Sequence, residues 1–101
     1  MARWTEKAER ELFRLFSVIR SAREAQMLLT DLLTPAEIRS LTKRWLELQE
    51  LARGVSQREV VKKLHVSISK VTRGSRVLRH GTGGAWLFLK RLGKLKKPKK
   101  S

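Results

Sequence analysis

Residues 56–79 read SQREVVKKLHVSISKVTRGSRVLR, and this stretch decides the fold because it carries the pattern of two short helices joined by a tight turn. Ser56 can cap the first helix, and Glu59, three residues later, completes a capping box. The turn around His65 is so short that the two helices must meet at a steep angle, and Ser67 can cap the second one. The stretch therefore predicts a helix–turn–helix.

The second helix of this pair has an apolar side and a basic side. Ile68, Val71 and Leu78, with Val77 beside Leu78, recur at helical spacing, so we expect them to face inward. The outward positions carry hydroxyl groups or positive charges and are Ser69, Lys70, Thr72, Arg73, Arg76 and Arg79. A helix with this outer face suits the major groove of DNA, which phosphates line. We expect the segment to bind DNA.

Charge is distributed unevenly along the 101 residues. The chain has 24 Lys and Arg residues against 9 Asp and Glu residues, a net charge of +15. From Gly54 onward there are 14 basic residues and a single acid, Glu59. Such a field attracts polyanions. The alternative from another class is a basic amphipathic membrane-surface protein that uses residues 85–92 and the lysine-rich end, but a membrane anchor has no use for a recognition helix.

Several classes of protein are excluded by what the chain lacks. Without cysteine there is no disulfide or thiolate metal site, and no apolar run approaches the roughly 18 residues of a membrane span. The early charges do not fit a signal peptide, so we expect a cytoplasmic protein. The two histidines have no acid–base partner at useful spacing. We therefore predict no enzyme activity, no catalytic or metal-binding residue and no cofactor.

The rest of the chain also has helical periodicity. We expect helices over about residues 3–19, 22–32 and 35–53, and a short one from residue 85. Thr34 as a cap, with Pro35 and Glu37 after it, is a strong start signal for the third helix. The prediction is an all-α chain of five to six helices. It forms one helical domain over residues 1–93, with the helix–turn–helix at 56–80 and a disordered basic tail at 94–101.

The long helix at 35–53 has more apolar surface than one small core needs. One face is lined by Ile38, Leu41, Trp45, Leu48 and Ala52, while Leu46 and Leu51 form a second apolar edge. Packing within a monomer is the simpler interpretation. A twofold homodimer would cover both edges and present two recognition helices to successive major grooves, and we favour it.

Four features together resemble the Trp repressor family. They are LLTPAE at 32–37, Arg44, SQRE at 56–59 and VTRGS at 71–75. HGTGGAWL at residues 80–87 is similar to the YerC-like branch of the same superfamily. The resemblance implies an intertwined homodimer that binds an operator in double-stranded DNA as a repressor, with L-tryptophan as corepressor. A regulator of this superfamily that is independent of ligand, or that senses another effector, stays open as an alternative.

The resemblance also implies an effector site. The indole would lie between the guanidinium planes of Arg44 and Arg73, which stack well on aromatic faces. Val77 stands where the family usually has a serine that holds the ligand's amino group, and Asp31 stands where an apolar residue is usual. The implied effector positions are Leu33, Thr34, Arg44, Leu48, Arg73, Gly74 and Val77.

Corresponding roles on DNA follow from the same resemblance. Arg58 matches the family's guanine reader, a role that bidentate arginine fills well. Val61 replaces a family lysine, a charge that Lys62, Lys63 or Arg76 could restore. Gln57, Thr72 and Arg79 match phosphate contacts. The base-proximal start of the recognition helix is matched by Ile68, Ser69 and Lys70. The implied DNA-binding positions are Gln57, Arg58, Ile68, Ser69, Lys70, Thr72, Arg76 and Arg79.

His65 and the glycines around the helix–turn–helix have structural interpretations. His65 occupies a turn position where glycine is common, and histidine tolerates positive φ better than most residues. Gly54 and Gly81 are placed to end the helices before them, and residues 81–84 form a cap and linker.

Overall fold

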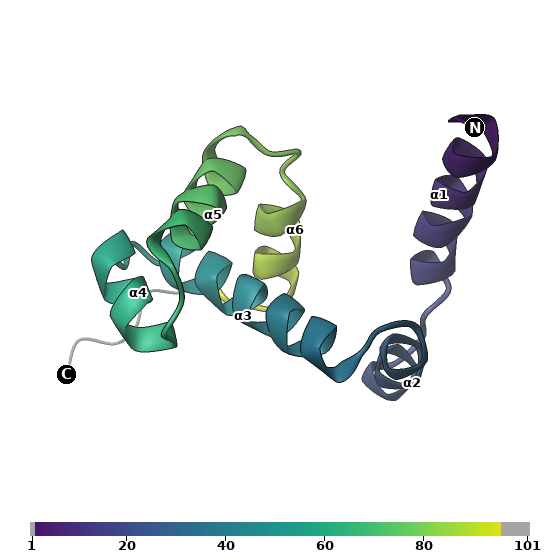
Figure 1. The fold of residues 1–101 in the computed structure, drawn as a ribbon, viewed down its shortest axis with the longest axis horizontal. Coiled ribbons are helices and arrows are strands. Elements are labelled where there is room, and N and C mark those ends of the chain that lie inside the picture. The colour runs from purple at the N-terminus through teal and green to yellow at the C-terminus, as the bar shows by residue number, and fades with distance from the viewer. Residues whose placement is uncertain (1, 96–101) are drawn as a thin grey trace. The chain divides into compact units, whose positions relative to one another are not determined.

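The computed structural model describes residues 2–95, with side chains described from Thr5 onward (Figure 1). Within that range there are six helices and no strand, which confirms the predicted all-α class. The helix ends differ from the predicted ranges by at most two residues. Residues 96–101 of the predicted tail lie outside the described part. The helices are α1 Ala2–Ser17, α2 Ala22–Leu32, α3 Pro35–Ala52, α4 Gln57–Leu64, α5 Ile68–His80 and α6 Gly84–Arg91.

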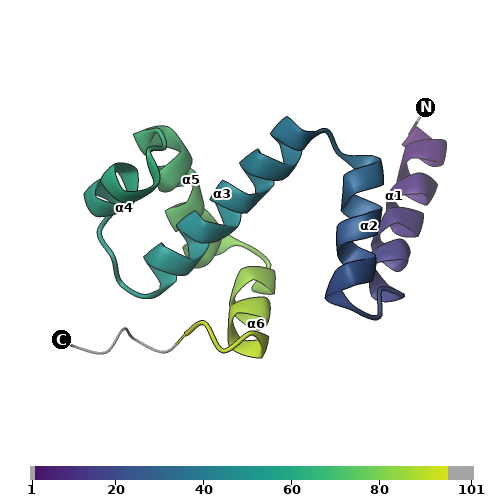
Figure 2. The same cartoon turned by 90° about the horizontal axis from the view of Figure 1, so that it is seen from below.

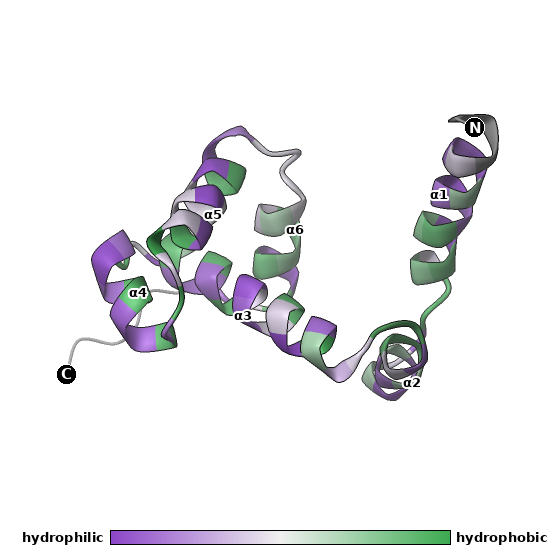
Figure 3. Ribbon diagram, in the orientation of Figure 1, coloured by the Kyte–Doolittle hydropathy of each residue, from purple (hydrophilic) through white to green (hydrophobic). Residues whose placement is uncertain are grey.

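The chain divides into two compact units, one up to Ile38 and the other from Arg39. The boundary falls inside α3, after its first turn. We call them the N-terminal unit, with α1 and α2, and the helix–turn–helix unit, with α4, α5, α6 and most of α3. The apolar residues of α1 and α2, green in Figure 3, are largely exposed, as Phe13 at 68% and Met27 at 57% show.

Local capping sets where α3 begins and ends. The Thr34 amide donates to Glu37 Oε1 at 2.9 Å, and the Glu37 amide donates to Thr34 Oγ1 at 3.1 Å. This reciprocal pair confirms the predicted start signal. At the other end Gly54 has a φ of 91°, and its amide donates to the Leu51 carbonyl at 3.0 Å. The backbone freedom of glycine therefore ends the helix where the sequence predicted.

The core of the helix–turn–helix unit draws one fully buried side chain from each of three helices: Val60 of α4, Val71 of α5 and Leu89 of α6. Figure 2 shows these three helices arranged around the second half of α3. The Trp86 indole donates to the Leu78 carbonyl at 2.8 Å and fastens α6 to α5. A Cβ atom at Gly74 would lie 3.2 Å from Leu51 Cδ1, so α5 crosses α3 at close range.

The apolar stripe predicted on α3 is only partly covered by the described residues. Leu41 and Leu46 are 45% and 38% exposed, and the rest of the stripe is half-buried. The buried residues of α3 are instead polar: Glu47, Gln49 and Glu50. The exposed Leu41 and Leu46 agree with the expectation that this helix has more apolar surface than one small core covers, while the helix–turn–helix unit covers a polar side of α3. The inward placement of Ile68 is wrong, since this side chain is 54% exposed at the start of α5.

Candidate nucleic-acid interface

The helix–turn–helix is built from local backbone geometry. Ser56 Oγ accepts from the Glu59 amide at 3.2 Å, and Ser67 Oγ accepts from the Lys70 amide at 3.3 Å, so each helix has its predicted cap. Between them His65 adopts the left-handed conformation, with φ 54° and ψ 49°. The predicted structural role of His65 is confirmed, because this conformation turns the chain from α4 into α5.

Two fully buried valines form the base of this pair of helices. Val60 faces inward from α4 and Val71 from α5, and both are 0% exposed. Full burial of a valine contributes about 1.5–3 kcal/mol relative to exposure. The two helices pack against each other across the tight turn that joins them (Figure 1). The buried valines therefore hold α4 and α5 together, and this fixes the position of the side chains on their outer faces.

The outer face of α5 carries hydroxyl groups and positive charges and no acid. All six predicted outward residues are exposed or nearly so: Ser69, Lys70, Thr72, Arg73, Arg76 and Arg79. Thr72 Oγ1 donates to Gln57 Oε1 at 3.1 Å, which brings together two of the predicted phosphate contacts from different helices. Because that oxygen is engaged, the amide nitrogen of Gln57 is the group that can donate to a phosphate.

The cations of α4 fall into two kinds. Arg58, on the first turn, and Lys62, on the last, are exposed. Lys63, next to Lys62, is also exposed, but its Nζ lies 2.5 Å from Glu50 Oε1. Lys63 is one of three residues expected to replace a missing family charge on DNA. In this structure its ammonium is engaged by a carboxylate, which leaves Lys62 and Arg76 as candidates.

The predicted effector positions fall in both units. Leu33 and Thr34 precede α3 in the N-terminal unit, while the other five lie in the helix–turn–helix unit. A Cβ atom at Gly74 would lie 3.7 Å from Leu48 Cδ2, so these two predicted positions are adjacent. Arg44 on α3 and Arg73 on α5 are both exposed, with their guanidinium groups accessible to a ligand.

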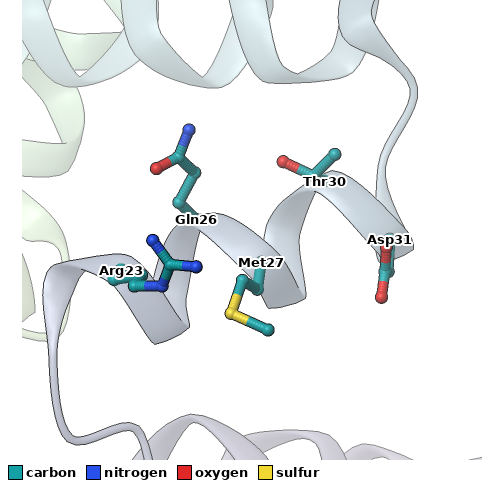
Figure 4. A pocket seen from close by; sticks show the side chains of 5 residues that line it. All are labelled: Arg23, Gln26, Met27, Thr30 and Asp31. Atoms are coloured by element: carbon teal, nitrogen blue, oxygen red, sulfur yellow. The ribbon is translucent and has the colours of Figure 1, made fainter.

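An open hollow of about 380 Å³ lies along α2. Its lining residues are Arg23, Gln26, Met27, Thr30 and Asp31. Figure 4 shows that all five project from this one helix, with Gln26 and Thr30 on the same side. A hollow lined by one helix does not enclose a flat aromatic ligand. The exposed Asp31 shares it with Arg23, a residue of opposite charge.

The burial of two acids of α3, Glu47 and Glu50, was not predicted from the sequence. Glu50 is 8% exposed, and its two oxygens accept from Lys63 Nζ at 2.5 Å and Arg53 Nη1 at 3.3 Å. The hydrogen bond from Lys63 is the main cause that lowers the pKa of Glu50, although burial opposes it. Glu47 is 3% exposed and has no hydrogen bond or ion pair among the described residues. Lys63 lies thirteen residues after Glu50, a spacing that carries no helical signal.

Comparison with known proteins gives this arrangement a family. The profile of the Trp repressor protein family matches residues 7–93. A Trp operon repressor homolog from Vibrio parahaemolyticus is 42% identical over 78 residues, which cover 73% of this chain and 76% of the relative. Another from Vibrio campbellii is 44% identical over 69 residues, which cover 64% and 69%.

No solved structure matches the chain significantly. Among the helices of residues 2–95, none has the length and apolar character that a membrane span requires. The family match covers the capped α3, both helices of the helix–turn–helix and α6. The chain belongs to the Trp repressor family, and it is a DNA-binding transcription regulator rather than an enzyme.

Proposed function

We propose that this protein is a homodimeric repressor that binds a twofold operator and takes L-tryptophan as corepressor. The observation that carries the proposal is the acid-free outer face of α5, held beside the exposed Arg58 by the buried pair Val60 and Val71. Arginine can make two hydrogen bonds to guanine in the major groove. The surrounding hydroxyl and cationic groups suit phosphates, which set position rather than sequence.

Homodimer formation is supported by apolar surface that the single chain leaves open. The exposed apolar residues include Leu41 and Leu46 on α3, and Phe88 of α6 at 51%. Exposed apolar side chains that gather on a surface mark an interaction site, and in a twofold dimer a second copy would cover them with the same residues. A twofold dimer also presents two recognition helices to two half-sites of an operator, as dimeric helix–turn–helix proteins such as the Trp repressor do on DNA.

L-tryptophan as corepressor is supported by the pairing of α3 and α5. Arg44 and Leu48 lie on α3, and Arg73 and Gly74 lie on α5. The Leu48 side chain lies close to the backbone of Gly74. Two arginines suit an indole and a carboxylate. Val77 offers methyl groups where a hydroxyl would serve the ammonium, a loss of about 1–3 kcal/mol when nothing replaces it. We therefore expect weak binding of L-tryptophan.

Calorimetric titration of the purified protein tests the corepressor. The ligands are L-tryptophan and indole-3-propionate, which lacks the amino group, and the proteins are wild type and Val77→Ser. Val77→Ser should tighten L-tryptophan and leave indole-3-propionate unchanged. If both ligands respond alike, or neither binds at about millimolar concentration, the site does not serve tryptophan. The protein would then be a ligand-independent regulator or one with another effector.

A further inference from the structure

The Glu50 carboxylate forms two ion pairs, one of which joins α3 to another helix. Arg53, the partner of Glu50 Oε2, lies on the turn that ends the same helix. Lys63, the partner of Oε1, lies on the last turn of α4. Of these two ion pairs, only the one with Lys63 joins α3 to α4. The Glu50 carboxylate is buried, while the Lys63 side chain is 62% exposed.

The helix pair α4–α5 therefore has two anchor points on α3. The first is the close approach of α5, where Gly74 meets Leu51. The second is the Lys63–Glu50 pair from α4. One point of contact permits a pair of helices to pivot, whereas two points fix their angle. The link between the two helices is itself held to the end of α3, since the Val55 amide donates to the Glu50 carbonyl at 3.1 Å, so the Lys63–Glu50 pair is the contact that holds the last turn of α4.

We propose that Glu50 is a positioning residue for DNA recognition, which holds α4 on α3 through Lys63 and so fixes the angle at which Arg58 meets a base pair. The proposal rests on the reader role of Arg58, but not on the identity of the effector. Arg58 and Lys63 lie on the same short helix, at its two ends. A change of tilt at Lys63 is therefore carried to Arg58 through a rigid helix.

Two substitutions of opposite charge separate positioning from simple electrostatics. Glu50→Gln removes a negative charge, and Lys63→Met removes a positive one. If these groups act only through the field of the protein, Glu50→Gln raises affinity for all DNA and Lys63→Met lowers it. If they position α4, both variants lower the ratio of operator affinity to random-duplex affinity. We expect each loss to be at least about threefold and no larger than the loss caused by Arg58→Ala.

Three further variants make the measurement specific. Lys63→Arg keeps the ion pair and should keep the ratio. Lys62→Met, at the exposed neighbouring lysine, should weaken both duplexes alike and lower the dependence on salt. In an Arg58→Ala background, Glu50→Gln should cause no further loss of the ratio, because the two residues act through one contact.

The experiment is a fluorescence-anisotropy titration against a selected operator and a random duplex, at several salt concentrations. Protein concentrations refer to the active fraction, found by stoichiometric titration, so misfolded protein does not imitate a loss of selectivity. The proposal is overturned if Glu50→Gln leaves the ratio unchanged while Arg58→Ala lowers it. If Arg58→Ala itself leaves the ratio unchanged, the reader role falls, and the proposal falls with it.

Discussion

At the scale of single residues, the interface combines exposed charges with a few buried contacts that hold them. Arg58 is exposed on the first turn of α4, two residues before Val60, which is fully buried. A buried anchor this close limits the positions that the arginine can take. Selectivity for a base pair needs such a restraint, because a guanidinium must align with two acceptors at once.

Replacing Arg58 with alanine is expected to weaken operator binding by about 1–3 kcal/mol and to change affinity for random DNA very little. The measurement is an anisotropy titration of both duplexes at one salt concentration. Arg79→Ala serves as the control, since the resemblance implies a phosphate contact there, and it should weaken both duplexes alike. Equal losses for Arg58→Ala on both duplexes would assign Arg58 to a phosphate instead.

The lowered pKa of Glu50 implies that the stability of the fold depends on pH. Its folded-state pKa is lowered below the ordinary value of 4.5, chiefly by the hydrogen bond from Lys63. The folded state therefore favours the ionised carboxylate. This stabilisation is fully present above the unfolded pKa and is lost as pH falls through the folded pKa.

Urea unfolding of wild type and Glu50→Gln across this acid range measures the effect. The stability difference between the two proteins should be constant near neutral pH and shrink as the pH falls below 4.5. Glu9→Gln, at an exposed acid of α1, is the control and should show little difference at any pH. A difference that does not depend on pH would mean that the charge of Glu50 does not stabilise the fold.

At the scale of helices and turns, the left-handed turn at His65 controls the angle between α4 and α5. Its φ of 54° is unfavourable for most residues and most unfavourable for β-branched ones. His65→Val should therefore lower the free energy of unfolding by about 1–2 kcal/mol, as measured by urea denaturation. His65→Asn should stay within about 0.5 kcal/mol of wild type. Equal stability of the two variants would show that the turn does not keep this conformation.

Helix limits could be predicted from the sequence because capping is local. Thr34 and Glu37 lie three residues apart, as do Ser56 and Glu59, so their pattern is visible without tertiary structure. The covered side of α3 could not be predicted in this way. Which helices lie against it depends on distant segments, and nothing in the local pattern of α3 indicated that Glu50 would be buried.

The same distinction between local and long-range features applies to the candidate site. The exposed face of α5 follows from its own periodicity, so its outward residues could be predicted from the sequence. The Glu50–Lys63 pair could not be found, because its partners come from different helices at no regular spacing. The inward prediction for Ile68 followed from its helical spacing with Val71, but Ile68 is the first residue of α5 and its side chain is 54% exposed.

At the scale of the whole molecule, the net charge of +15 sets how strongly the protein attracts DNA of any sequence. Deleting residues 94–101 removes five lysines and should lower affinity for operator and random duplex alike. The slope of log affinity against log salt should fall by about 0.9 for each phosphate that these lysines neutralise in the full-length protein. An unchanged slope after truncation would mean that these lysines do not bind DNA.

Effector and operator binding must be linked if the two arginines of α3 and α5 hold a corepressor. A ligand that binds the DNA-competent arrangement of the helices raises operator affinity, and operator then raises ligand affinity by the same factor. Random duplex should show a much smaller effect, because phosphate contacts alone do not require the recognition angle.

The most direct test titrates a selected operator and a random duplex with the protein, in the presence and absence of saturating L-tryptophan. We predict that L-tryptophan raises operator affinity selectively, and that calorimetry of the operator complex shows L-tryptophan bound more tightly by the same factor. Equal affinity for the two duplexes, with and without L-tryptophan, would contradict it.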